Sequence, residues 1–203
     1  MQIHILYQLK IIMAKTLKTI TEEEFKVLPV EQKRVLIAKD VLSQLKAKKI
    51  VAKRGEVLVP SILRETNRSI TSMRSVQKDI QASKYCTVCA KGAVVCSLIN
   101  KFNHASGRSI STMYRGDYRA HEVLNTKKIF GPDLWAELEC QFEGDIYYRT
   151  PAVHKLLKTN VSYWNGWTQE PASPNPEKKS LASLMNNLIK NKGKLKIKGK
   201  LIG

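Results

Sequence analysis

The chain has 203 residues, a hydrophobic fraction of 43% and a formal net charge of +18 at pH 7. This length suits one folded domain, and the hydrophobic fraction excludes a disordered chain. The excess of 35 basic over 17 acidic residues predicts an anionic partner such as a nucleotide or nucleic acid. Every apolar run is shorter than the roughly 18 residues of a membrane span, so no membrane partner is predicted.

The first predicted elements are helices. Residues 1–20 are interpreted as an N-terminal extension, with Met13 as a natural start. Thr21 and Glu24 have the spacing of a capping box, which indicates the start of a helix. A longer helix is predicted at about Val30–Lys48, because its apolar residues recur at helical spacing.

A small β-hairpin is predicted near residues 50–59. Two short apolar runs flank Lys53-Arg54-Gly55, and Gly55 suits the positive φ of a tight turn. The next predicted helices are at Met73–Ala82, Cys86–Lys101 and Tyr114–Leu124.

The clearest helical pattern runs from Gly131 to Gly144. Pro132 favours its first turn, and Gly144 favours its end. One face is apolar, with Leu134, Trp135, Leu138 and Phe142. Four acidic residues, Glu137, Glu139, Glu143 and Asp145, are interpreted as a solvent-exposed face rather than a metal-dependent nuclease site, because Glu137 and Glu139 point in different directions.

The C-terminal third is interpreted as peripheral. Residues 147–167 are aromatic and irregular, and prolines predict a linker at 169–179. Residues 180–203 form a short helix with a narrow apolar stripe and a lysine-rich end, which is interpreted as a basic tail that docks or stays mobile. The fold class is therefore mainly α, or α+β with one small β-hairpin: a single compact helical core domain at 21–168 plus a basic C-terminal tail.

The cysteines Cys86, Cys89, Cys96 and Cys140 do not have the spacing of a disulfide framework. Zinc is one interpretation of Cys86-x-x-Cys89, but a second pair at similar spacing is missing. Buried, metal-free thiols in the core are favoured, with Cys89, Ala93 and Cys96 inside the protein. No secretory signal pattern is present, so a reducing cytoplasm is predicted.

Binding is better supported than catalysis. The sequence has no glycine-rich phosphate loop and no nucleophile or metalloprotease motif, so no catalytic residue, metal or cofactor is predicted. Arginine side chains bind phosphate with two hydrogen bonds, and the rings of Tyr and Trp can stack on bases. The alternative for several of these Tyr and Trp residues is that their rings belong to the hydrophobic core. The candidate ligand-binding residues are Lys53, Arg54, Arg108, Arg115, Arg119, Tyr148, Arg149, Trp164 and Trp167.

Three segments resemble an uncharacterised family of small phage and prophage proteins. They are Cys86-Thr-Val-Cys89-Ala-Lys-Gly92-Ala93, residues 37–45 and residues 133–144, and the resemblance covers about residues 20–145. It brings no catalytic residues with it. It implies a viral, bacteriophage protein that acts in the host bacterial cytoplasm, and by analogy with other small phage proteins an anti-defence role.

Two functional hypotheses follow. The favoured one is a homo-oligomer that sequesters a phosphate-bearing, nucleotide-like host immune signal without cleaving it. The alternative is a nucleic-acid-binding protein that acts on host DNA or transcription, with non-specific contacts through the lysine-rich tail. Inhibition of a host defence protein through the acidic helix is a third hypothesis.

Overall fold

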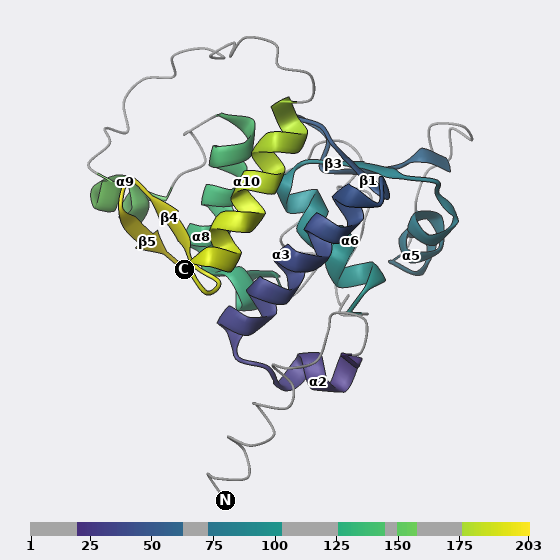
Figure 1. Cartoon of the computed structure of the whole chain (residues 1–203), viewed down its shortest axis with the longest axis horizontal. Coiled ribbons are helices and arrows are strands. Elements are labelled where there is room, and N and C mark those ends of the chain that lie inside the picture. The colour runs from purple at the N-terminus through teal and green to yellow at the C-terminus, as the bar shows by residue number, and fades with distance from the viewer. Residues whose placement is uncertain (1–19, 63–72, 103–125, 145–149, 158–175) are drawn as a thin grey trace, which may run out of the picture.

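Helices supply most of the core in the computed structural model of this chain (Figure 1). The structure describes residues 20–62, 73–102, 126–144, 150–157 and 176–203. The helices are α2 (Glu22–Val27), α3 (Val30–Lys46), α5 (Met73–Ala82), α6 (Ala90–Asn100), α8 (Thr126–Glu143), α9 (Pro151–Leu157) and α10 (Pro176–Lys190). The strands are β1 (Ile50–Ala52), β2 (Leu58–Pro60), β3 (Cys86–Val88), β4 (Leu195–Ile197) and β5 (Lys200–Ile202). The predicted fold class, mainly α with a small β component, is confirmed.

The first two helices form where the sequence predicts them. The Thr21 hydroxyl accepts a hydrogen bond from Glu24 N at 3.2 Å, and the Glu24 carboxylate accepts one from Thr21 N at 2.9 Å. This reciprocal pair satisfies amides that a helix start leaves open. The next helix, α3, buries one apolar face, formed by Ile37, Ala38, Val41 and Leu45.

The predicted hairpin at 50–59 is wrong in its pairing. A third strand, β3, lies between β1 and β2, parallel to β1 and antiparallel to β2. Thr87 is therefore opposite both Val51 and Val59. The prediction paired β1 with β2 because these two apolar segments are neighbours in the sequence. The buried strand β3 lies between them instead and forms hydrogen bonds along both of its edges. The connection from β1 to β2 still turns at Gly55, with φ +71°.

The Cys-x-x-Cys segment is a strand followed by a helix, and not one helix from residue 86. Cys86 lies in β3, and α6 begins at Ala90. The Cys89 thiol accepts a hydrogen bond from Gly92 N at 3.4 Å and so caps the helix start. The prediction followed apolar content, which does not separate a buried strand from a buried helix. The position of α6 at the centre of the core is confirmed, since residues 90–99 are all buried.

The helix predicted from Gly131 begins earlier, at Thr126, and changes direction at Gly131. That glycine has φ 68° and ψ 163°, which interrupts the helical path. The buried guanidinium of Arg34 donates to the carbonyl oxygens of Ile129 at 2.5 Å and Phe130 at 3.2 Å. Arg34 thus satisfies carbonyls that the interrupted helix leaves open.

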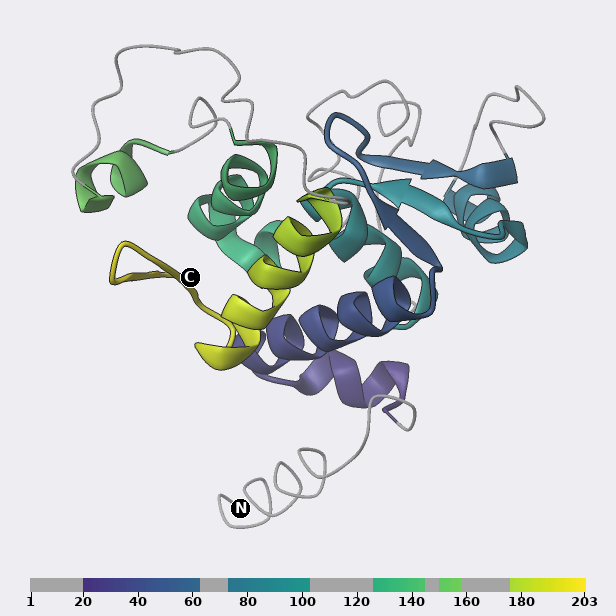
Figure 2. The same ribbon diagram turned by 45° about the horizontal axis from the view of Figure 1, so that its top comes forward.

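The interpretation of residues 180–203 as a peripheral tail is corrected. Helix α10 packs along α3 and against α8, as Figures 1 and 2 show. The residues that it and the following hairpin bury in the common core are Leu181, Leu184, Met185, Leu188, Leu195 and Ile202. The narrow apolar stripe of α10 is enough to hold this helix on the domain, because α3 and α8 both pack against it.

Helix α9 lies within the segment that the sequence analysis described as irregular. Among the helices of the described ranges, none combines the length and apolarity that crossing a bilayer requires.

Candidate functional site

Lys53 and Arg54, the two candidates at the predicted hairpin tip, both have partners within the protein. Lys53 forms an ion pair with Glu56. Arg54 Nε donates a hydrogen bond to the carbonyl oxygen of Phe142 at 3.0 Å. Gly55 N donates to the Glu143 carboxylate at 3.1 Å. The connection between β1 and β2 is therefore docked on the C-terminal end of α8.

The remaining candidates lie outside the described residues. They are Arg108, Arg115, Arg119, Tyr148, Arg149, Trp164 and Trp167. A ring-lined basic pocket formed by these residues stays a prediction.

The acidic face predicted on α8 is wrong, because Glu137 and Glu139 are buried. Glu139 forms an ion pair with Lys91, and both side chains are about nine-tenths buried. The Lys91 ammonium also lies 5.4 Å from the ring centroid of Trp135, a cation–π contact. The prediction took these carboxylates to be solvent-exposed, but the first turn of α6 covers Glu139 through Lys91. The function of this charged cluster is to join α6 to α8.

Glu143 is the carboxylate at the outer end of this cluster. Burial raises the pKa of Glu143 to about 7, although the hydrogen bond from Gly55 N opposes the shift. The nearby Glu139 carboxylate adds to the rise in pKa. Glu143 therefore changes its charge near neutral pH while it holds the β1–β2 connection.

The cysteines are free and buried, and the predicted burial of Cys89, Ala93 and Cys96 is confirmed. Burial raises the pKa of the Cys89 thiol to about 12. A hydrogen bond with the Cys86 thiol and burial together raise the pKa of Cys96 well above its ordinary value. Within the described ranges, no three His, Cys, Asp or Glu side chains converge as a metal site would require.

Exposed charge in the described part of the chain is strongly one-sided. Its exposed carboxylates are Glu23 and Glu31, because folding buries or partly buries the other acidic residues. Exposed lysines lie on most of the described elements, including α2, α5, α8 and α9. One group of them lies on α3, on α10 and the turn that follows it, and on the β4–β5 hairpin. We call these residues the basic face: Lys39, Lys46, Lys178, Lys179, Lys190, Lys192, Lys196, Lys198 and Lys200.

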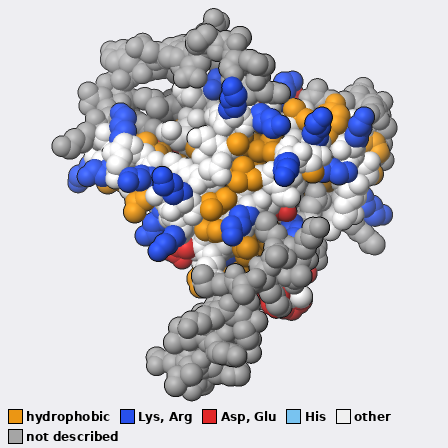
Figure 3. Space-filling view, viewed as in Figure 1, with side chains coloured by type: hydrophobic (Ala, Val, Ile, Leu, Met, Phe, Trp, Pro, Cys, Tyr) orange, Lys and Arg blue, Asp and Glu red, His pale blue; other side chains and the backbone are white. Residues whose placement is uncertain are grey.

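Figure 3 shows basic side chains spread across this view of the molecule, over these elements and also over the side where β1, β3 and α5 lie. The elements are held next to one another by the packing of α10 on α3 and of β4 on α10. Lys192 and Lys198 have positive φ values of 52° and 46°, so lysine occupies turn positions that usually favour glycine or asparagine. The lysine-rich end is thus displayed on a folded surface.

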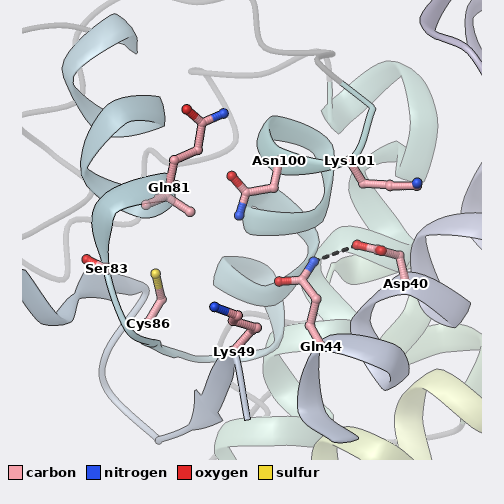
Figure 4. A pocket seen from close by; sticks show the side chains of 9 residues that line it. Asp40, Gln44, Lys49, Gln81, Ser83, Cys86, Asn100 and Lys101 are labelled. Atoms are coloured by element: carbon pink, nitrogen blue, oxygen red, sulfur yellow. Dashed lines mark hydrogen bonds between the residues drawn. The ribbon is translucent and has the colours of Figure 1, made fainter. Parts of the chain in front are cut away.

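A pocket of about 340 Å³ lies where the C-terminal end of α3 meets α5, β3 and α6. Its lining comprises Asp40, Gln44, Lys49, Ile80, Gln81, Ser83, Cys86, Asn100 and Lys101. Figure 4 shows Gln44, Lys49, Gln81, Cys86 and Asn100 around a common space, with Asp40 and Lys101 at one end.

None of these lining residues was a candidate from the sequence. They come from α3, α5, β3, α6 and the connections between them. Cys86 belongs to the Cys-x-x-Cys motif, but that motif was interpreted as core thiols and not as a binding site. The aromatic and arginine pattern that guided the candidate list has no counterpart in this pocket, so sequence spacing gave no signal for it.

Comparison with known proteins finds no match to this chain among family models, curated proteins or solved structures.

Proposed function

We propose that this protein binds nucleic acid through its basic face. The observation that supports the proposal is the separation of charge by folding: lysines stay exposed on α3, α10 and the β4–β5 hairpin, whereas most acidic residues in the described ranges are at least half-buried. A duplex has about one phosphate charge per 1.7 Å of its axis, so it neutralises a broad lysine surface better than a small anion does.

The β4–β5 hairpin gives this surface a projecting part. Its strands are joined by the two-residue turn Lys198-Gly199, with φ values of 46° and 78° as in a type I′ turn. Lys196, Lys198 and Lys200 are all exposed on it. A two-stranded β-ribbon fits the major groove of B-DNA, and lysine side chains contact phosphates as point charges.

Sequestration of a small phosphate-bearing signal is the second candidate function. The residues predicted for a ring-lined pocket lie mostly outside the described ranges, and Lys53 and Arg54 are bound within the protein. The phage setting implied by the sequence resemblance is compatible with either ligand. Nucleic-acid binding is therefore the function to test first.

The test is binding of a DNA duplex, measured by fluorescence anisotropy over a range of salt concentrations. Affinity should fall steeply with salt, with a slope of about −0.9 per phosphate contacted. Replacing Lys179, Lys192 and Lys198 together by Gln should weaken binding and lower the slope by about one per lost contact.

A matched triple variant removes the same charge elsewhere, with Gln at Lys26, Lys78 and Lys84, which are exposed on or beside α2 and α5. It should retain most of the affinity. Equal loss in both triple variants would mean that total charge alone attracts the duplex. Binding of anionic lipid vesicles with the same lysine dependence, and no duplex binding, would assign the face to a membrane surface and overturn the proposal.

A further inference from the structure

The pocket between α3, α5 and α6 contains an ammonium group that lacks an ion-pair partner among the described residues. Lys49 lines the pocket, and Figure 4 shows its side chain directed toward the side where Cys86 lies. The ion pairs in the described ranges involve Lys26, Lys53 and Lys91 instead. Lys49 is thus available to an anionic group of a ligand.

The carboxylate in the pocket wall does not neutralise Lys49. Asp40 accepts hydrogen bonds from the Ser97 hydroxyl at 2.8 Å and from Gln44 Nε2 at 2.5 Å. Burial also raises the pKa of Asp40, which opposes its ionisation, and the positive charge of Lys101 acts against this rise. Asp40, Gln44 and Lys101 therefore interact with one another at one end of the pocket and leave Lys49 without a carboxylate partner.

Carboxamides and an apolar side chain also border the pocket. Gln81 from α5 and Asn100 from α6 both border the space in Figure 4. A carboxamide has a donor and an acceptor side by side, which matches the paired donor and acceptor of a nucleobase edge such as N6 and N7 of adenine. Ile80 supplies apolar surface beside Gln81, as a planar base needs.

From this arrangement we propose that the pocket binds a mononucleotide, with Lys49 on the phosphate and the Gln81 and Asn100 carboxamides on the base. The volume of about 340 Å³ lies in the range of small-molecule sites. This site is distinct from the basic face and from the ring-lined pocket predicted from the sequence. It does not depend on nucleic-acid binding.

The test uses AMP as the probe, with the full chain and isothermal titration calorimetry. AMP should bind more tightly than either inorganic phosphate or adenosine, because each of these fills only half of the pocket. Lys49→Gln should weaken AMP binding roughly tenfold, the effect of losing one charge-assisted contact. Lys128→Gln removes the same charge from an exposed lysine on α8 that neither lines the pocket nor belongs to the basic face, and it should change the affinity less than about twofold.

A second variant tests the base. Gln81→Ala should weaken AMP several-fold and leave the weaker binding of inorganic phosphate unchanged. Lys49 and Gln81 are exposed, so both variants should unfold at the same urea concentration as the parent. The proposal fails if AMP does not bind at millimolar concentration, if Lys49→Gln and Lys128→Gln behave alike, or if phosphate binds as tightly as AMP. The basic-face triple variant should bind AMP normally, which separates this test from that of nucleic-acid binding.

Discussion

Lys91 and Glu139 form an ion pair inside the protein, with side chains that are 10% and 8% exposed. It joins the first turn of α6 to the middle of α8. Removing one partner leaves an uncompensated buried charge, so we expect Lys91→Met to lower the free energy of unfolding by about 3–5 kcal/mol. Urea unfolding followed by circular dichroism measures this change.

Two comparisons establish the cause. The double variant Lys91→Met/Glu139→Leu removes both charges and should recover much of the lost stability. The Lys53–Glu56 pair is far more exposed, with Lys53 at 50%, so Lys53→Met should cost less than about 1 kcal/mol. Equal losses for Lys91→Met and Lys53→Met would contradict the role of burial.

Gly92 is the second site at which a small change should have a large effect. A Cβ atom there would lie 1.2 Å from the carbonyl oxygen of Val57, so Gly92→Ala must push α6 away from β2. We expect a loss of at least about 3 kcal/mol, the upper end for overpacking. Gly55→Ala serves as the control: Gly55 has open space around it but a φ of +71°, so it should cost only about 1–2 kcal/mol. A larger loss for Gly55→Ala, again by urea unfolding, would refute the close contact.

The C-terminal helix and hairpin should be required for folding. Deleting residues 178–203 removes core residues such as Leu181 and Leu188, each worth about 1.5–3 kcal/mol of burial, which together rival a typical total stability. We therefore expect the truncated chain to lose its cooperative thermal transition. A truncated chain that melts cooperatively at the parent's temperature would restore the interpretation of this segment as a dispensable tail.

Two point variants test the contribution of the C-terminal segment to folding without changing its charge. Leu188→Ala, at a side chain 1% exposed, should cost about 2–5 kcal/mol. Leu201→Ala makes the same chemical change at a position that is 52% exposed, so its effect should stay within about 0.5 kcal/mol. Urea denaturation of both variants, compared with the parent, gives the two values.

Stability should fall as the pH rises toward neutral, with Glu143 as one cause. The folded-state pKa of Glu143, about 7, is above the ordinary value of 4.5, so the folded protein retains a proton that the unfolded chain loses between these pH values. Glu143→Gln should therefore reduce the pH dependence of the unfolding free energy between about pH 4.5 and 7. The exposed Glu23→Gln should leave that dependence as in the parent. The two variants giving identical pH profiles would exclude Glu143 as a contributor.

Local patterns were enough to predict several elements from the sequence. The capping box at Thr21 and Glu24, the helix α3 and the helix at 73–82 follow from contacts within a few residues, so a linear pattern contains the necessary information. Composition predicted a basic protein, apolar periodicity predicted a helical core, and the apolar neighbours of the cysteines predicted that they are buried. The side chains of Cys89 and Cys96 are inside, as expected from their apolar surroundings.

Tertiary packing decided the features that those patterns could not contain. The pairing of β1 is decided by β3, a strand that begins 26 residues after the end of β2. The burial of Glu139 is possible because it forms an ion pair with Lys91, 48 positions away in the sequence. The narrow stripe of α10 is a core element only because α3 and α8 meet there. The pocket around Lys49 exists only where α3, α5, β3 and α6 converge, since its groups are distant in sequence and no local interaction brings them together.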